Sequence, residues 1–325
     1  MSNNTSTLIK PDIDNARIGI ALGSGSARGW AHIGVLKALA EMGIEPQIIA
    51  GSSIGALVGA AYASHKLDDM EKMVQALTWK ELVSYMDMSI IGGGLIHGDK
   101  LVHFLRQQVN AQTIESLPRR FGAVATELDS GREVWLQQGD LVDAVRASGA
   151  LPGLFTPFKM DQQWLIDGGI VDPVPVSLCR AMGAEIVIAV SLNEDIVGKH
   201  ARNNKLNDKS LNREPVSNIR NTDLWNRISE QLEKTMFKQK NLLLSRLLGE
   251  STGAPGLIEV IAGSINIMQD RITRSRMAGD PPDIILSPKL SQLGLMEFDQ
   301  GKRAIAEGRA CVERNSSALE HLFSK

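Results

Sequence analysis

Ser53 stands in the segment GSSIG (51–55), where a glycine lies two residues away on either side. An apolar run precedes the segment and a small-residue run follows it, so the pattern predicts a strand, a sharp turn and a helix. In a nucleophile elbow the residues at these two positions approach each other closely, which explains Gly51 and Gly55. The helix that follows aims free N–H groups at the serine. The segment indicates an activated Ser53, with Ser52 the weaker candidate, although a turn that only packs a helix on a sheet would use similar residues.

A second small-residue turn, GSGSARG (23–29), also joins a predicted strand to a predicted helix. Its backbone N–H groups are suited to hold the negative charge on an attacked carbonyl oxygen. The alternative is a dinucleotide-binding loop, but Arg28 occupies the place of the third glycine of that fingerprint, and Gly29 follows one residue late. Loops that follow neighbouring parallel strands meet at one edge of the sheet, so the two turns support each other. Arg28 is expected to anchor the loop, the alternative being that it adds positive charge near the site.

A serine nucleophile needs a group that accepts its proton. Asp167 ends a predicted strand and precedes Gly168 and Gly169, which let the backbone turn tightly beside another group. Asp172 precedes a proline and is expected to be structural, because Asp-Pro is an ordinary turn or helix start. Asp167 is therefore the preferred partner of Ser53.

The histidines offer a weaker choice of base. Many hydrolases use the chain order serine, acid, histidine, and His200 and His321 are the histidines that follow Asp167. Neither follows a predicted strand, so we expect both to lie at the surface.

The elements that must position these residues alternate between strands and helices. Strands are expected at 17–22, 47–51, 121–128, 132–137, 164–167 and 184–192, and helices at 30–43 and 54–64. This alternation favours a mainly parallel sheet with helices on both faces.

The chain is predicted to divide into four parts. Residues 1–16 form a disordered leader, 17–195 the catalytic core, 196–222 a polar insertion or linker, and 223–325 a helical part that completes the same domain. The last part is expected to hold helices at 223–248, 254–277 and 297–323, with a strand after Pro281. The segment 223–249 carries an apolar stripe at helical spacing, which would suit either packing on the core or contact with a lipid surface.

Composition limits the function classes. Of the 325 residues, 43% are apolar and 22% charged, and the net charge of −2 gives no bulk attraction to nucleic acid. The two cysteines, Cys179 and Cys311, form no disulfide framework and no metal-ligand spacing, which fits a reducing compartment. The polar N-terminus lacks a secretory signal, and no apolar stretch approaches the ~20 residues needed to span a bilayer. A cytoplasmic protein is expected, with contact at the inner face of the membrane left open.

The motifs together resemble the patatin-like phospholipase family. They stand in family order as GSGSARG, GSSIG and DGG, and GWAHIGVLKAL and ASGALPGLFTPF also look like family segments. The similarity covers about residues 17–195. It continues through RSRMAGDPPDIIL toward the bacterial RssA-type subgroup, which is related to the catalytic region of neuropathy target esterase.

The resemblance implies a three-layer α/β/α fold and a Ser–Asp dyad without histidine, in which Ser53 is the nucleophile and Asp167 the base. It implies an oxyanion hole formed by amides around Gly25, Ser26 and Ala27. Ser24 and Ser26 stand where many members have glycine. The supporting motif residues are Gly23, Ser24, Arg28, Gly29, Gly51, Gly55, Gly168 and Gly169.

The implied activity is hydrolysis of a fatty acyl ester, with phospholipid or lysophospholipid as substrate and no metal or cofactor. Two alternatives remain at this point. One is an acyltransferase that uses the same dyad, and the other is a catalytically quiet regulatory protein on this fold.

Overall fold

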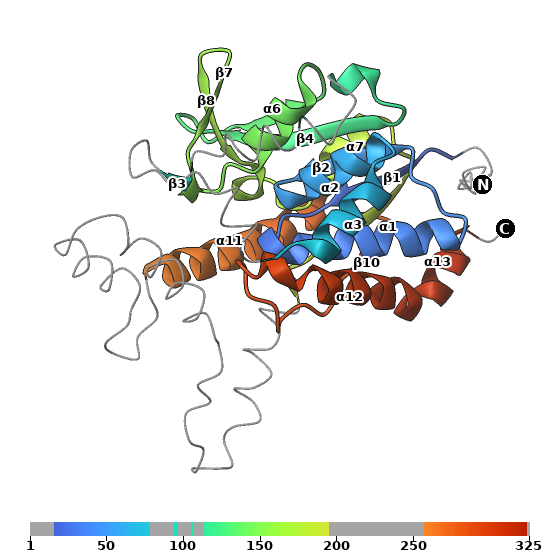
Figure 1. Ribbon diagram of the computed structural model, residues 1–325. Helices are drawn as coiled ribbons and strands as arrows, with labels where there is room; N and C mark the ends of the chain where they lie inside the picture. The colour runs from blue at the N-terminus through green and yellow to red at the C-terminus, as the bar shows by residue number, and fades with distance from the viewer. Residues whose placement is uncertain (1–15, 79–93, 97–105, 107–112, 195–256, 324–325) are drawn as a thin grey trace, which may run out of the picture.

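The computed structural model describes residues 16–78, 94–96, 106, 113–194 and 257–323 (Figure 1). The predicted leader, the polar insertion and the predicted helix at 223–248 lie outside these residues, except that Ala16 is described.

An eight-stranded sheet runs through the molecule in the order β10-β9-β1-β2-β4-β8-β7, with β5 paired to β4. Five neighbouring strands are parallel, namely β10 (Ile284–Leu286), β9 (Ile186–Val190), β1 (Ile18–Leu22), β2 (Ile48–Ser52) and β4 (Arg120–Glu127). The antiparallel strands are β5 (Glu133–Leu136) and β8 (Gln163–Asp167), which pair with β4, and β7 (Phe158–Met160), which pairs with β8. The prediction of a mainly parallel sheet is confirmed. A separate two-stranded sheet joins β3 (Gly94–Ile96) to β6 (Gly153–Phe155).

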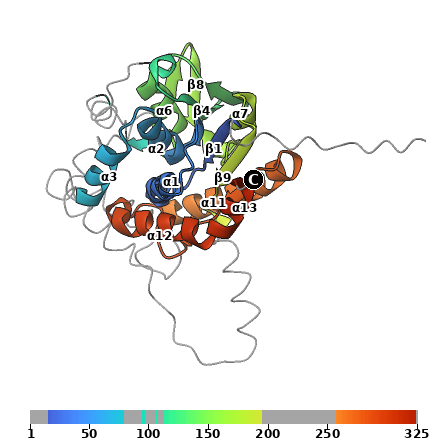
Figure 2. The ribbon, with the colours of Figure 1, turned by 90° about the vertical axis from the view of Figure 1, so that its right-hand side faces the viewer.

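Helices flank the sheet on both sides, as Figure 2 shows for α1 and α2 on one side of the strands and α7 on the other. The α-helices are α1 (Ala31–Glu41), α2 (Ile54–Ala63), α3 (Leu67–Ala76), α6 (Leu141–Ser148), α7 (Val176–Ala181), α11 (Leu257–Gly279), α12 (Gly301–Arg314) and α13 (Ser316–Phe323). Short 3-10 helices are η1 (Ser26–Trp30), η2 (Ile114–Ser116), η3 (Gly168–Ile170) and η4 (Phe298–Gln300).

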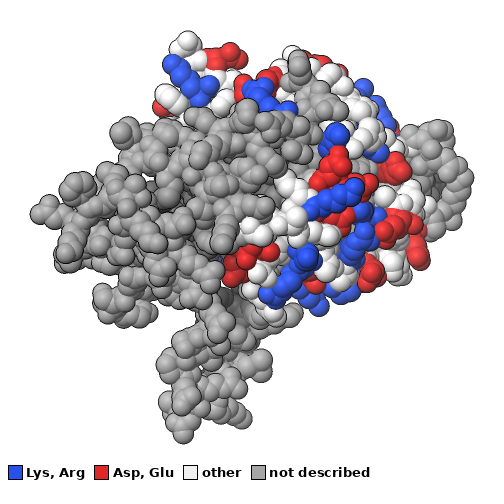
Figure 3. All heavy atoms as spheres, viewed as in Figure 1, with Lys and Arg blue, Asp and Glu red and all other residues white. Residues whose placement is uncertain are grey.

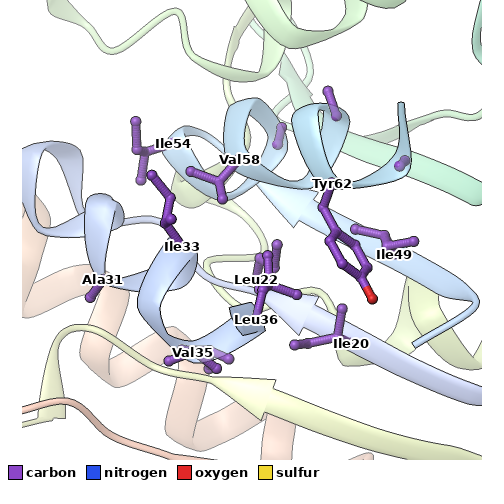
Figure 4. Close-up of a cluster of buried hydrophobic side chains, with 14 of the residues drawn as sticks. Ile20, Leu22, Ala31, Ile33, Val35, Leu36, Ile49, Ile54, Val58 and Tyr62 are labelled. Carbon is purple, nitrogen blue, oxygen red and sulfur yellow. The ribbon is translucent and has the colours of Figure 1, made fainter. Parts of the chain in front are cut away.

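The core lies on both faces of the parallel strands, because successive side chains of a strand point to opposite faces. Ile20 and Leu22 of β1 belong to the larger buried cluster, together with apolar residues of α1 and α2 (Figure 4). Apolar residues of α12 belong to the same cluster. Ala21 of the same strand belongs to the smaller cluster, where Leu178 and Cys179 of α7 pack. Strands buried on both faces explain why their sequences read as continuous apolar runs.

The C-terminal helices pack closely on the N-terminal ones. A Cβ atom at Gly34 of α1 would lie 1.9 Å from the Ile305 carbonyl oxygen of α12, and one at Gly308 of α12 would lie 2.0 Å from the Ala31 carbonyl oxygen. The two helix backbones therefore meet where each contributes a glycine.

The closing helix predicted at 297–323 is in fact broken into η4, α12 and α13. At the break, the side-chain amide of Asn315 donates to the Cys311 carbonyl oxygen at 2.8 Å. That oxygen is the one a continuing helix would pair with the Asn315 backbone N–H. The side chain thus favours a helix end that the apolar spacing did not show.

Charges of both signs share the surface. On the face shown in Figure 3, Lys and Arg side chains lie among Asp and Glu side chains over the described part. Ion pairs connect helices, since Lys37 of α1 lies 2.8 Å from Asp68 of α3, and Arg309 of α12 lies 2.8 Å from Glu41 of α1. This mixture agrees with the near-zero net charge.

Candidate active site

Ser53 sits on a strained turn between β2 and α2. Its backbone has φ 56° and ψ −122°, a conformation that residues with a side chain rarely adopt. Both flanking glycines are required by space. A Cβ atom at Gly51 would lie 2.5 Å from the Cα of Ala56, and one at Gly55 would lie 2.1 Å from the Leu22 carbonyl oxygen. The local geometry is that of a nucleophile elbow.

Asp167 reaches Ser53 across the end of β4. Ser52 of β2 pairs with Val124 of β4, and the next β4 residue, Ala125, pairs with Asp167 at the end of β8. The Ser53 Oγ atom donates a hydrogen bond to Asp167 Oδ2 at 2.5 Å. The Gly169 N–H donates to Asp167 Oδ1 at 2.7 Å, so both carboxylate oxygens are occupied. The sheet thus brings together two residues that lie 114 positions apart in the sequence.

Burial makes Asp167 a stronger base than an ordinary aspartate. Its side chain is 0% exposed. Burial raises its pKa from 3.8 to about 6, against the hydrogen bonds from Ser53 and Gly169, which lower the pKa. A carboxylate with a pKa in this range is still ionised at neutral pH, and it binds a proton more readily than a surface aspartate does.

Gly168 and Gly169 leave room for this arrangement. A Cβ atom at Gly168 would lie 2.1 Å from the Val124 carbonyl oxygen. One at Gly169 would lie 2.5 Å from Gln269 Nε2, 2.7 Å from Ser24 Oγ and 2.9 Å from Asp167 Oδ1. The two glycines of the DGG motif therefore allow polar groups to crowd around the turn that follows the aspartate.

Asp172 plays a different part from Asp167. It is buried, and its Oδ1 atom lies 3.2 Å from Arg276 Nε of α11. Arg276 also pairs with Glu133 of β5 at 2.8 Å. Burial raises the pKa of Asp172 to about 8 despite the Arg276 charge, which lowers it. The side chain thus links α11 to the segment after η3, in keeping with the structural role expected for it.

The loop between β1 and η1 uses most of its amides to hold itself in place. The Gly23 N–H donates to the Val190 carbonyl at 3.1 Å, and the Ser24 N–H donates to the Pro173 carbonyl at 2.8 Å. Among the described residues, the backbone N–H groups of Gly25 and Ser26 have no acceptor. Ser26 has a positive φ of 53°, so this part of the loop holds an unusual backbone conformation.

Ala27 differs from the sequence-based expectation. Its N–H donates to the Leu295 carbonyl oxygen at 3.0 Å, so it is not free to bind an oxyanion in this structure. Leu295 belongs to the segment between β10 and η4, far away in the sequence, and no local pattern around Ala27 indicates this contact. Of the three predicted amides, those of Gly25 and Ser26 remain available.

Arg28 and Gly29 attach the loop to its surroundings. Arg28 is buried, and its Nε donates to the Leu293 carbonyl oxygen at 3.0 Å, so this side chain anchors the loop to the segment that follows β10. A Cβ atom at Gly29 would lie 2.2 Å from the side chain of Ile54. Because Ile54 directly follows Ser53, Gly29 lets the loop approach the elbow closely.

Three further side chains contact the motifs and were not singled out from the sequence. Ser148 Oγ accepts a hydrogen bond from the Ser53 N–H at 2.9 Å, and Thr126 Oγ1 donates to the Asp167 carbonyl oxygen at 2.8 Å. His32 Nε2 lies 2.8 Å from the Gly23 carbonyl oxygen, and burial lowers the pKa of its ring to about 4. Ser148 lies in ASGALPGLFTPF, a segment that the sequence analysis found similar to the family but to which it assigned no role.

No described histidine has a hydrogen bond to Ser53 or Asp167. His32 contacts the glycine-rich loop instead, and His321 lies near the end of α13. His200 lies outside the described residues. In the described ranges, no three His, Cys, Asp or Glu side chains are grouped to hold a metal ion. None of the described helices has the length and apolar character needed to cross a membrane.

Fold and site together define a class: an α/β protein with a serine at a strand–helix turn and a buried aspartate beside it. The comparisons with known proteins specify the family. Residues 20–180 match the model described as patatin-like phospholipase. An uncharacterised NTE family protein of Mycobacterium tuberculosis is 34% identical over 337 residues, which cover 94% of this chain and 92% of that protein. The chain belongs to the patatin-like phospholipase family, and at the family level this supports lipid hydrolysis.

More distant relatives agree. The human patatin-like phospholipase domain-containing protein 6 is 32% identical over 182 residues, which cover 54% of this chain and 13% of that protein. The crystal structure of VipD from Legionella pneumophila matches with a TM-score of 0.53 at 14% identity, over 93% of this chain and 67% of that chain. This last likeness supports the fold.

Proposed function

We propose that this chain is a serine lipid acyl hydrolase in which Ser53 is the nucleophile and Asp167 the general base. The observation that carries the proposal is the 2.5 Å hydrogen bond from Ser53 Oγ to a fully buried Asp167 carboxylate. Ser53 itself is only half-buried and can be reached by a substrate, whereas Ser52 is fully buried.

The reaction proceeds in two halves. Ser53 Oγ bonds to the ester carbonyl carbon while its proton passes to Asp167 Oδ2. The carbonyl oxygen becomes an oxyanion, which the N–H groups of Gly25 and Ser26 stabilise. The bond to the alcohol breaks, and Asp167 returns the proton to that leaving group. Water then attacks the acyl-enzyme, gives a proton to Asp167, and releases the fatty acid as Ser53 regains its proton.

The decisive experiment combines a fluorophosphonate probe with hydrolysis assays on a short soluble ester and on lysophospholipid. The probe should add to Ser53 in the parent protein, as located by peptide mass mapping. Ser53→Ala should lose hydrolysis by about 10⁶-fold in kcat, the size seen when another serine hydrolase loses its nucleophile.

Ser52→Ala is the matched control, because it removes a neighbouring hydroxyl that has no partner within the described structure. It should keep most of the activity. Labelling of Ser52, or no labelling at all, would contradict the proposal. Faster acyl transfer to an added alcohol than to water would favour the acyltransferase instead.

We propose that the enzyme meets its lipid substrate through the exposed face of α11. The segment 223–249, whose apolar stripe would suit either packing on the core or contact with a lipid surface, lies outside the described residues. Four apolar side chains of α11 are exposed at helical spacing, namely Val260, Ile261, Ile267 and Met268. Arg271, farther along the helix, is also exposed. The opposite face of this helix packs Gln269 against the turn after Asp167. One side of α11 thus carries the apolar face, and the opposite side contacts the turn that follows Asp167. The positive charge of Arg271 suits an anionic lipid surface.

Ile267→Glu with Met268→Glu should weaken sedimentation with phosphatidylglycerol vesicles by at least about tenfold, because two charges would have to enter the interface. Ser275→Glu with Ala278→Glu adds the same charge to exposed positions farther along the helix and is the control. Equal loss of vesicle binding in both variants would mean that the added negative charge weakens binding regardless of its position on α11. Unchanged binding in the first variant would exclude this face.

A further inference from the structure

The end of α6 contacts the backbones of both dyad residues. Ser148, the last residue of this helix, accepts the Ser53 N–H on its Oγ at 2.9 Å. Two residues later, the Ala150 carbonyl oxygen accepts the Asp167 N–H at 3.0 Å. One short turn therefore holds the amide of the nucleophile and the amide of the base, and it sets the two backbones relative to each other.

A second hydroxyl holds Asp167 from the other side. Thr126 of β4 donates from Oγ1 to the Asp167 carbonyl oxygen at 2.8 Å. Asp167 is thus held at its N–H by Ala150, at its carbonyl by Thr126 and at its side chain by Gly169. Little freedom remains for its carboxylate to move away from Ser53.

Burial makes these hydroxyl contacts hard to replace. Ser148 is 0% exposed and Thr126 is 1% exposed. Loss of either hydroxyl would leave its partner without a hydrogen bond where bulk water does not reach. For Ser53 the loss falls on a backbone that is already strained, and a strained conformation persists only while its surroundings hold it. Relaxation of the turn would move Ser53 Oγ, and misplacement of a reacting atom by about 1 Å can cost about 10²-fold in rate.

We propose that Ser148 and Thr126 are positioning residues that together maintain the contact between Ser53 Oγ and Asp167 Oδ2. This inference rests on the proposed function, because it assigns a role within the same reaction. Neither hydroxyl contacts the reacting oxygens. Ser148 acts through the backbone of Ser53, and Thr126 acts through the backbone of Asp167.

The first test replaces Ser148 by alanine. Hydrolysis of a short soluble ester should fall by about 10- to 100-fold in kcat, with KM changed less than about twofold, since the substrate-contacting groups remain. The fluorophosphonate labelling rate should fall in parallel. The acidic limb of the kcat profile should also move to higher pH, because the hydrogen bond from Ser53 lowers the pKa of Asp167 and would be weakened.

Ser52→Ala is again the control. Ser52 and Ser148 are both fully buried serines, yet Ser52 Oγ has no partner within the described structure. If burial of a hydroxyl were all that mattered, the two variants would behave alike. We expect Ser52→Ala to keep kcat and the pH limb of the parent.

The second test compares two variants at Thr126. Thr126→Val keeps the shape but removes the donor, whereas Thr126→Ser keeps the donor and removes a methyl group. The valine variant should lose about tenfold in kcat, and the serine variant should stay within about threefold of the parent. The reverse order would show that packing, not the hydrogen bond, is the contribution of this residue.

Hydrogen exchange of the peptide that contains Ser53 separates this inference from the proposed function. Its amide should exchange faster in Ser148→Ala than in the parent or in Ser52→Ala, whether or not the protein hydrolyses esters. A parent that neither hydrolyses esters nor reacts with the probe would refute the proposed function alone. Unchanged exchange in Ser148→Ala, or unchanged kcat and pH limb in an active parent background, would overturn the positioning role.

Discussion

Replacement of Asp167 by asparagine should abolish ester hydrolysis and yet make the folded protein more stable above about pH 6. Asparagine is close to aspartate in shape. Its carbonyl oxygen can accept the Gly169 N–H, and its amide can donate to Ser53 Oγ. The buried negative charge is what disappears, and with it the base.

The magnitude follows from the pKa of the buried carboxyl. Burial raises this pKa from 3.8 to about 6. At about 1.36 kcal/mol per pKa unit, ionisation of Asp167 costs the folded state about 3 kcal/mol. The folded state favours the protonated acid. The wild type therefore has its full stability below about pH 4 and loses about 3 kcal/mol of it as the pH rises through about 6. Asparagine does not ionise and avoids this loss.

Thermal unfolding at pH 4 and at pH 8 measures the effect. At pH 8 the Asp167→Asn variant should melt about 6 °C above wild type, at roughly 2 °C per kcal/mol for a chain of this size. At pH 4 the difference should shrink to about 1 °C. Asp129→Asn, which removes an exposed carboxylate, is the control for the loss of one negative charge.

Two results would refute this reasoning. Equal melting differences at both pH values would mean that Asp167 is not a buried group with a raised pKa. An asparagine variant that is less stable at pH 8 would mean that its hydrogen bonds to Ser53 and Gly169 outweigh the cost of burying its charge.

Three other predictions concern helix packing and the histidines. Gly308→Ala should destabilise the protein by about 1–3 kcal/mol in thermal melting, because its Cβ atom would lie 2.0 Å from a carbonyl oxygen of α1. Gly263→Ala is the control. Its Cβ atom would have no atom within 4 Å, so this variant should be neutral or more stable. An equal loss in both would contradict the close contact of α1 and α12. His32 should stay neutral from pH 8 to pH 5, because burial lowers its pKa to about 4; a ring titration by NMR with a midpoint near 6.5 would be inconsistent with this burial. His321→Ala should keep kcat within about threefold, and a loss as large as that of the aspartate variant would make a histidine the base.

The sequence alone predicted the local geometry of the turn that carries Ser53. Gly51 and Gly55 indicated the elbow because a sharp strand–helix turn leaves no space for a Cβ atom at those positions, and the structure shows both close approaches. The alternation of strands and helices predicted the mainly parallel sheet, because apolar runs buried on both faces are typical of such strands. These features depend on neighbours in the sequence, so a local pattern is sufficient to show them.

Only the tertiary structure decided which distant groups meet at the site. Ser53 and Asp167 come together because β8 pairs antiparallel with β4 beside β2, and no periodicity specifies that strand order. Ala27 was expected to hold an oxyanion, but its amide pairs with Leu295. The hydroxyl of Ser148 reaches the elbow from 95 residues away. Contacts of this kind follow from how helices and strands pack in three dimensions. The spacing of residues within one segment does not specify which distant segment packs against it.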